Sequence, residues 1–167
     1  MIRAMLRQLD LLAWLTAALG VVVLGTVLAS QYLGGLQPCE LCLYQRWPWA
    51  AAIALGLLAA LLRPLRRGLV LLAGIVILLG GALAVYHAGV EYQWWPGFTA
   101  CTSAISFGTG NAASLRDQLL AAPVVRCDVP GFVLFGISMA GYNAIVSVVA
   151  GLVLLAAATR RTSARAV

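Results

Sequence analysis

This chain of 167 residues has no lysine, five acidic residues and a single histidine, and only 10% of its residues are charged. A soluble domain of this length needs a polar coat, so the shortage of charge excludes an ordinary soluble globular protein. Basic residues interleaved with exposed polar surface are also missing, which argues against a nucleic-acid-binding patch. The abundant residues are apolar, at 63% of the chain with a mean hydropathy of +0.98. The composition indicates a protein that lies in a lipid bilayer.

Long stretches without charge predict membrane-spanning helices, which need roughly 18 to 20 apolar residues. Three stretches of the chain have this length without charge. Residues 41–62 are as apolar as these stretches but contain Arg46, and they predict a further span, the second in chain order. The N-terminal stretch follows Arg3 and Arg7 as a signal peptide would, but it lacks a small-residue cleavage site and precedes further apolar stretches. We therefore expect an all-α membrane protein, one domain over residues 1–167 with four transmembrane helices. The three uncharged stretches are residues 11–30, 68–88 and 131–159.

The arginines predict which way the chain crosses the membrane. Eight of the eleven fall on one side: before the first span, between the second and third, and after the fourth. The other side has Arg116 and Arg126 in a long loop, with Arg46 at the mouth of a helix. By the positive-inside rule both termini are cytoplasmic. The net charge of +6 therefore mostly reflects topology, and two loops, about residues 31–40 and 89–130, face the opposite compartment.

The long outer loop is expected to stay close to the membrane. Near its start, Trp94 and Trp95 form a pair typical of an interfacial aromatic belt. Residues 108–111 are polar and glycine-rich, which disfavours a rigid element. Ser114 then opens a capping-box-like stretch with leucines on one face, which predicts a short helix lying on the outer leaflet until Pro123. An ordinary surface turn is the alternative.

All four cysteines of the chain lie in these outer loops or where one enters a span, at Cys39, Cys42, Cys101 and Cys127. The first two form a C-x-x-C motif. A zinc site would need a second close pair or suitably spaced histidines, and a c-type haem would need a histidine where Leu43 stands. In an oxidising compartment, two cysteine pairs on one face of a membrane favour a disulfide relay that passes electrons into the bilayer. Two permanent disulfides that staple the outer loops are the alternative.

Arg46 and His87 are the candidate binding residues beside the C-x-x-C motif. Arg46 follows Cys42 by four residues, so we expect it on the same helix face about one turn deeper, where its charge must be compensated. Its guanidinium would stabilise a Cys42 thiolate and could donate hydrogen bonds to the oxygen of an electron acceptor. A snorkelling anchor is the alternative. His87 ends the third span and could face the same mouth, or be an ordinary interfacial histidine.

The fourth span carries small residues at helical spacing. Such a stripe is typical of close helix packing rather than of chemistry. Asn143 lies beside it, and we expect this side chain to form an interhelical hydrogen bond. The small residues are Gly136, Ala140, Ala144, Ser147 and Gly151.

Three stretches of the sequence are more specific than any single motif. They are Pro38-Cys39-Glu40-Leu41-Cys42-Leu43-Tyr44-Gln45-Arg46, the run from Tyr86-His87-Ala88-Gly89 through Trp95-Pro96-Gly97 to Cys101, and Cys127-Asp128 leading into Gly136-Ile137-Ser138-Met139-Ala140-Gly141-Tyr142-Asn143. Together they resemble the bacterial disulfide bond formation protein B (DsbB) family of quinone-dependent inner-membrane oxidases. The resemblance spans nearly the whole chain.

The resemblance implies a four-helix bundle in the bacterial inner membrane that works as an electron relay. A soluble periplasmic thioredoxin-like oxidase, DsbA-like, would hand its electrons to the loop pair Cys101 and Cys127. Those electrons would pass to Cys39 and Cys42, and then to ubiquinone or menaquinone from the membrane quinone pool, held beside Cys42. The relay implies no metal and no haem.

The resemblance also assigns roles to single residues. The family's quinone-proximal arginine matches Arg46, and its third-helix histidine matches His87. Gln45 stands where some members carry glutamate, so no acid–base role is assigned to it.

Two other functions stay open. The first is a membrane scaffold or binding subunit whose outer loops are held by two permanent disulfides, with Arg46 as an anchor. The second is a quinone enzyme like the vitamin K epoxide reductases, which also uses a bundle with a C-x-x-C motif. Its family surrounds the cysteines with different residues, so the DsbB resemblance is closer.

Overall fold

The computed structural model describes residues 2–97 and 125–159, with side chains from Arg7 onward. Most of these residues are helical, and a two-stranded hairpin precedes the last helix. In chain order the elements are α1 (Ile2–Tyr32), α2 (Glu40–Tyr44), α3 (Arg46–Leu61), η1 (Arg63–Leu65), α4 (Arg66–Glu91), β1 (Val133–Leu134), β2 (Ile137–Ser138) and α6 (Met139–Thr159).

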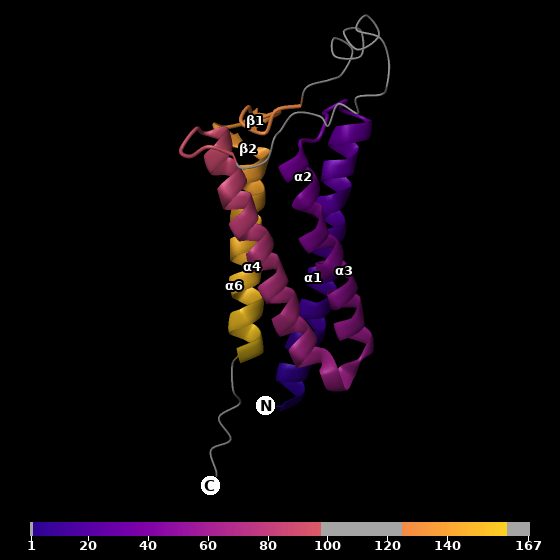
Figure 1. The fold of residues 1–167 in the computed structure, drawn as a ribbon. Helices are drawn as coiled ribbons and strands as arrows, with labels where there is room; N and C mark the ends of the chain where they lie inside the picture. Colours follow the sequence, from indigo (N-terminus) through magenta and orange to yellow (C-terminus); the bar gives the residue numbers. More distant parts are fainter. Residues whose placement is uncertain (1, 98–124, 160–167) are drawn as a thin grey trace, which may run out of the picture.

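The long helices run side by side as an elongated bundle (Figure 1). Helix α4 packs against α6 on one side and α3 on the other, and α3 packs in turn against α1. The start of α1, the η1 turn and the end of α6 lie at one end of the bundle. The end of α1, helix α2, the end of α4 and the hairpin lie at the opposite end. The C-x-x-C motif, Arg46 and His87 are therefore positioned near this second end.

Within the described residues, three helices are long and apolar enough to cross a membrane, by length and composition: Arg7–Tyr32, Arg63–Glu91 and Met139–Thr159. They correspond to three of the four spans expected from the sequence. Their outward faces carry large exposed apolar side chains, as contact with lipid requires, including Val22, Leu79 and Val149.

The stretch expected as the second span is helical but interrupted. Helix α2 ends at Tyr44, Gln45 caps it, and α3 then runs for 16 residues. Pro48 explains the interruption, because it has no N–H to donate to the carbonyl of Tyr44 four residues earlier. By itself α3 is shorter than the roughly 20 residues of a typical spanning helix.

The last helix begins later than the uncharged stretch 131–159 suggests. Residues before Met139 form a hairpin in which Val133 pairs with Ser138 and Leu134 with Ile137. Its turn requires positive φ at Phe135 (50°) and Gly136 (78°). The Ser138 hydroxyl then accepts a 3.1 Å hydrogen bond from the N–H of Gly141, which is N-terminal capping.

Small residues let the helices approach closely. A Cβ added at Gly56 would lie 2.8 Å from the backbone oxygen of Ala13, and one added at Gly151 would lie 2.5 Å from the side chain of Leu78. In lipid this close contact replaces the hydrophobic effect as the force that holds helices together. Of the stripe expected in the last span, Ala140, Ala144, Ser147 and Gly151 are buried in α6. The prediction is wrong for Gly136, which is exposed in the hairpin turn before the helix. The core residues are Leu9, Ala13, Trp49, Ala52, Ala59, Val70, Ala73, Ile77, Leu154 and Ala158.

Several sequence predictions fall outside the described residues. These are the short surface helix after Ser114, the glycine-rich run 108–111, Cys101, Arg116 and the arginines beyond Thr159.

Candidate redox site

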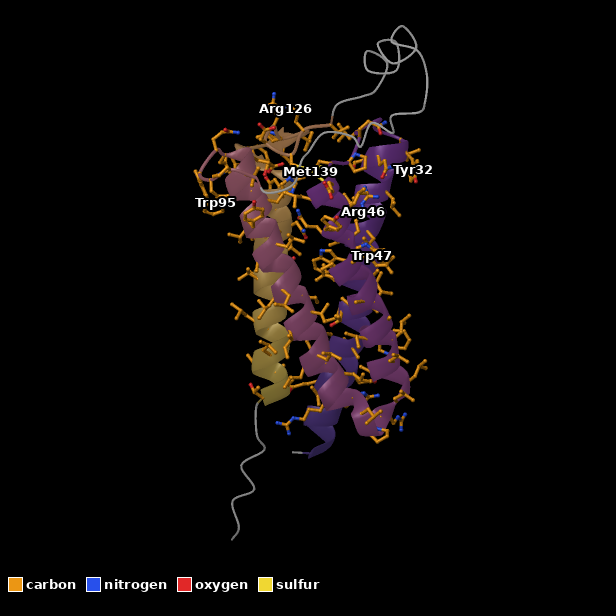
Figure 2. All side chains as sticks on the ribbon, viewed as in Figure 1. Tyr32, Arg46, Trp47, Trp95, Arg126 and Met139 are labelled. Atoms are coloured by element: carbon orange, nitrogen blue, oxygen red, sulfur yellow. The ribbon has the colours of Figure 1, made fainter. Side chains whose placement is uncertain are left out.

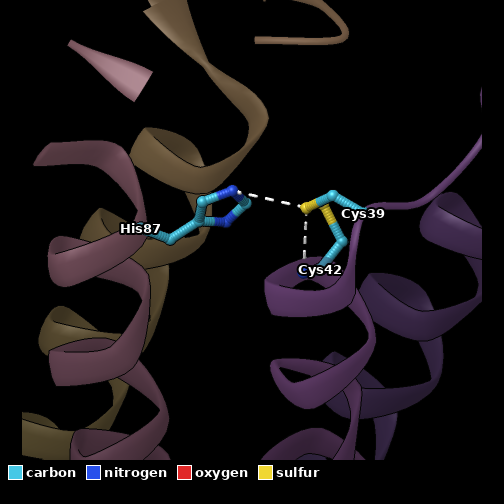
Figure 3. Close-up of side chains that lie close together, drawn as sticks. All are labelled: Cys39, Cys42 and His87. Carbon is cyan, nitrogen blue, oxygen red and sulfur yellow. Dashed lines mark hydrogen bonds between the residues drawn. The ribbon is translucent and has the colours of Figure 1, made fainter. Parts of the chain in front are cut away.

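The C-x-x-C motif lies at the start of α2, where Cys39 is the N-cap residue. Its Sγ accepts a 3.2 Å hydrogen bond from the N–H of Cys42, which fixes the first turn of the helix. The two Sγ atoms are 2.7 Å apart, and both cysteines are free thiols (Figure 3). An S–S bond of about 2.05 Å needs only a small movement from this position. The pair is therefore placed to change between dithiol and disulfide.

The two thiols of this pair are not equivalent. Cys39 is buried, whereas Cys42 is partly exposed. The pKa of the Cys39 thiol is raised, chiefly because its S–H donates to Cys42 Sγ and also because it is buried. Cys39 therefore keeps its proton, while the Cys42 sulfur receives a hydrogen bond. This arrangement favours Cys42 as the more reactive sulfur of the pair.

His87 reaches this pair from α4. Its Nε2 lies 3.5 Å from Cys39 Sγ, and the ring is only 1% exposed (Figure 3). On its other side, Nδ1 lies 2.6 Å from Nε2 of Gln45. His87 also hydrogen-bonds the backbone of Cys127. One imidazole thus contacts a residue from each of the two expected cysteine pairs.

Cys127 completes this cluster from the segment before the hairpin. It is 1% exposed and disulfide-bonded. It packs in one small apolar cluster with Cys39 and Leu41, flanked by Cys42 and Val125. Of the four predicted catalytic cysteines, three therefore gather at this end of the bundle. The fourth, Cys101, lies outside the described residues.

Arg46 begins α3 just below the C-x-x-C motif. Figure 2 shows it in the upper part of the bundle, between the levels of Tyr32 and Trp47. Its Nη2 donates a 2.8 Å hydrogen bond to Oε1 of Gln31 at the end of α1. Its Nε is buried and has no hydrogen-bond partner within the described part of the chain. A buried guanidinium N–H without an acceptor is costly, so this atom is suited to an oxygen supplied by a ligand.

Glu91 is a site residue that the sequence analysis did not single out. Its side chain is 6% exposed, with Oε1 3.8 Å from His87 Nε2. It hydrogen-bonds Ser138, while Oε2 has no partner among residues 2–97 and 125–159. Its position four residues after His87 on a helix was the available signal.

A polar network around Asn143 also joins the site. Asn143 accepts a 2.8 Å hydrogen bond from the indole of Trp49 and donates a 2.6 Å bond to Gln45, which confirms the expected interhelical contact. Gln45 in turn contacts His87. The sequence assigned no acid–base role to Gln45. The structure shows that its side chain nevertheless contacts His87 inside the bundle.

The side chains of Cys39, Cys42 and His87 could also be considered as metal ligands, since their donor atoms all lie within 4.8 Å of one another. Two thiolates on one tetrahedral zinc ion, each at about 2.3 Å, would be separated by about 3.8 Å. The 2.7 Å between Cys39 and Cys42 is much shorter. The spacing fits a redox pair better than two ligands of one ion.

The family model described as disulfide bond formation protein DsbB matches residues 9–157, a range that includes all four cysteines, Arg46 and His87. The chain belongs to the DsbB family. It is therefore a bacterial inner-membrane protein of disulfide bond formation, and the DsbB resemblance of its motifs is confirmed. The vitamin-K-epoxide-reductase-like alternative gives way to this assignment.

Two individual relatives are similar to most of the chain. Disulfide bond formation protein B of Aromatoleum aromaticum is 30% identical over 129 residues, covering 72% of this chain and 75% of the relative. A protein of Rickettsia prowazekii described as uncharacterized protein RP370 is 28% identical over 131 residues, covering 78% of this chain and 76% of the relative. No solved structure matches the chain significantly.

Proposed function

We propose that this protein reoxidises a periplasmic DsbA-like thiol oxidase and passes the electrons through two cysteine pairs to a membrane quinone. One observation carries the proposal. The imidazole of His87 contacts both Cys39 Sγ and the backbone of Cys127, so residues of the two pairs meet in one buried cluster. Thiol–disulfide exchange requires this proximity, since one sulfur must attack another directly.

The exchange balances as three successive transfers of two electrons. The partner's dithiol becomes a disulfide, and the loop pair Cys101 and Cys127 is reduced to two thiols. The loop pair is then reoxidised as the disulfide of Cys39 and Cys42 is reduced. The second pair returns to a disulfide when its two electrons and two protons leave to ubiquinone or menaquinone, which becomes the quinol.

Arg46 is the residue that we propose to hold the quinone. A quinone supplies an electron-accepting ring with two carbonyl oxygens, and each oxygen can accept a hydrogen bond. The buried Nε of Arg46 is a donor without a partner, and Gln31 holds the guanidinium through Nη2. The fit supports a quinone carbonyl beside the first turn of α3.

We also propose that α2 and α3 together form the second span in chain order, which brings the number of spans to four. Glu40 to Leu61 covers about 22 residues, or about 33 Å of helix, which matches a hydrocarbon core of about 30 Å. Arg63, Arg66 and Arg67 follow this span at the end of the bundle where α1 starts. The positive-inside rule then places that end in the cytoplasm and the cysteine cluster at the periplasmic face.

A reconstituted electron-transfer assay tests the function. Purified protein in lipid vesicles receives a reduced thioredoxin-like oxidase and ubiquinone or menaquinone, and quinone absorbance is followed. We expect catalytic quinone reduction, and none with Cys42→Ser. A folded wild-type protein that leaves both quinones oxidised would overturn the proposal.

A disulfide-stapled scaffold is the competing function. It requires both cysteine pairs to stay oxidised throughout. Thiol trapping in membranes distinguishes the two. A relay becomes partly reduced when quinone is withheld, and a scaffold stays oxidised.

A further inference from the structure

A chain of hydrogen bonds runs through the bundle to His87. It starts at the indole of Trp49 in α3, passes through Asn143 in α6 and Gln45 between α2 and α3, and ends at Nδ1 of His87 in α4. Its three links measure 2.8, 2.6 and 2.6 Å. Trp49, Gln45 and His87 are each no more than 7% exposed, so water does not compete for these bonds.

The first link fixes the direction of all the others. An indole N–H can only donate, so the Asn143 atom that it meets must be the carbonyl oxygen. The Ser147 hydroxyl lies 3.3 Å from the same oxygen. The amide nitrogen of Asn143 therefore turns toward Gln45 and must meet its carbonyl oxygen, as it does. Consequently the amide nitrogen of Gln45 faces His87 and donates to it.

This order determines the protonation of the imidazole. Because Nδ1 accepts from Gln45, a neutral His87 must carry its proton on Nε2. That nitrogen faces Cys39 Sγ at 3.5 Å. The hydrogen bond between His87 and the Cys127 backbone carbonyl also requires a ring N–H. The Glu91 carboxylate, with Oε1 3.8 Å from the same nitrogen, is an acceptor when ionised and so is compatible with a proton there.

We propose that Trp49, Asn143 and Gln45 are positioning residues that lock His87 in the Nε2–H tautomer, so that it donates to Cys39 Sγ and stabilises this sulfur as a thiolate. The proposal rests on the proposed function. Cys39 is protonated in the resting dithiol, and its proton must pass to the quinol when the pair Cys39 and Cys42 gives two electrons to the quinone and becomes a disulfide. The opposite tautomer would make His87 a base that accepts the Cys39 proton. The chain excludes that role for the neutral ring.

The tautomer can be measured directly because His87 is the only histidine of the chain. Protein without a histidine tag is labelled with ¹⁵N-histidine, reduced, and studied by NMR in lipid. The two ring nitrogens have widely separated shifts, and the bonded proton identifies which one is protonated. We expect a protonated Nε2 and a bare Nδ1. A protonated Nδ1 with a bare Nε2 in the wild type overturns the proposal.

Gln45→Glu reverses the last link of the chain. An ionised carboxylate can only accept, so His87 must present a proton on Nδ1, and the NMR signals should change accordingly. Quinone turnover should fall on the order of 10-fold, since the lost bond is one to a charged sulfur, while the quinone KM stays unchanged because Arg46 is untouched. Gln8→Glu, an exposed change of the same kind in α1, is the matched control and should change neither.

Trp49→Phe removes the donor that orients the chain, with the exposed Trp14→Phe as its control. We expect the single tautomer to become a mixture in Trp49→Phe and to persist in Trp14→Phe. An unchanged tautomer in both Trp49→Phe and Gln45→Glu overturns the proposal. If wild-type protein shows the Nε2–H tautomer but transfers no electrons to quinone, the tautomer assignment holds and the proposed function fails.

Discussion

Arg46 Nη2 donates a 2.8 Å hydrogen bond to Gln31 Oε1, which joins the first residue of α3 to the end of α1. The bond orients the guanidinium but uses only part of it, since Nε stays buried without a partner among the described residues. An arginine that served only as a membrane anchor would extend toward the headgroups instead. The geometry therefore favours a ligand-binding role.

Replacing Arg46 should weaken quinone binding. Arg46→Ala is expected to raise the quinone KM on the order of 10-fold and to slow turnover, because a hydrogen bond from a charged group is lost. Arg46→Lys should restore part of the effect, since it returns the charge without the planar fork. Steady-state quinone kinetics measure both. The exposed Arg7→Ala serves as control, and wild-type kinetics in Arg46→Ala would reduce this residue to a helix anchor.

Cys42 should be alkylated before Cys39 in the reduced protein. Thiolates react and thiols do not, and the pKa of Cys39 is raised by its hydrogen bond to Cys42 and by burial. A raised pKa keeps Cys39 protonated at neutral pH, so its labelling should increase only as the pH rises toward that pKa. Iodoacetamide labelling with mass spectrometry of the peptides measures this order. The same pair in unfolded protein should react at equal rates, and faster labelling of Cys39 in the folded protein would contradict the assignment.

Helix packing gives a prediction about stability. Gly56→Ala should lower the melting temperature in detergent, since the new Cβ would lie 2.8 Å from the Ala13 oxygen and 2.9 Å from the Ala17 nitrogen, and backbone atoms cannot move aside easily. Overpacking of this kind costs about 1–3 kcal/mol. Gly25→Ala is the matched control because nothing lies within 4 Å of its added Cβ. Equal melting temperatures for the two variants would mean that α1 and α3 can move apart at this position without a loss in the free energy of unfolding.

The sequence predicts the helices well where a run of residues is long and uncharged. The prediction is less accurate for the apolar residues before Met139. Hydropathy alone does not distinguish a membrane-spanning helix from the β1–β2 hairpin that these residues form. The glycine at position 136 was the available signal in the sequence, because glycine often marks a turn, and in the structure it has a positive φ. Likewise, Pro48 could have predicted the interruption between α2 and α3.

The candidate site shows a similar division. Local spacing indicates Cys39, Cys42 and Arg46, since they lie within two turns of one another. The chain from Trp49 through Asn143 to His87 depends on the packing of α3, α4 and α6, and residues 94 positions apart meet in its first link. No periodicity within one helix determines how that helix is rotated against its neighbours. Such contacts come only from the folded structure.

Each cysteine, once reduced, should react with a membrane-impermeant thiol reagent added from the periplasmic side, and the buried Cys39 should do so only at alkaline pH. This follows from the proposed orientation, in which the arginine-rich end of the bundle lies in the cytoplasm. Spheroplasts labelled before and after permeabilisation provide the measurement, with single-cysteine variants to separate the four positions. Labelling of any of the four only from the cytoplasmic side would reverse the orientation and exclude a periplasmic partner.

The two cysteine pairs should act in a fixed order. A partner that lacks its second cysteine cannot resolve the bond it makes, so a mixed disulfide should accumulate with this protein. We expect that bond on Cys101, so that it disappears in Cys101→Ser and persists in Cys39→Ser. Non-reducing electrophoresis and peptide mapping identify it.

Replacing Cys42 separates the two halves of the relay. Cys42→Ser should leave the loop pair able to accept electrons once from the partner, but it should abolish quinone reduction, because the terminal step needs the Cys42 thiolate. Burst measurements of partner oxidation and quinone absorbance distinguish these steps. If the trapped bond maps to Cys39 in the otherwise wild-type chain, then the partner reaches the buried pair directly, the loop pair is structural, and electrons do not flow through Cys127 into the cluster at His87.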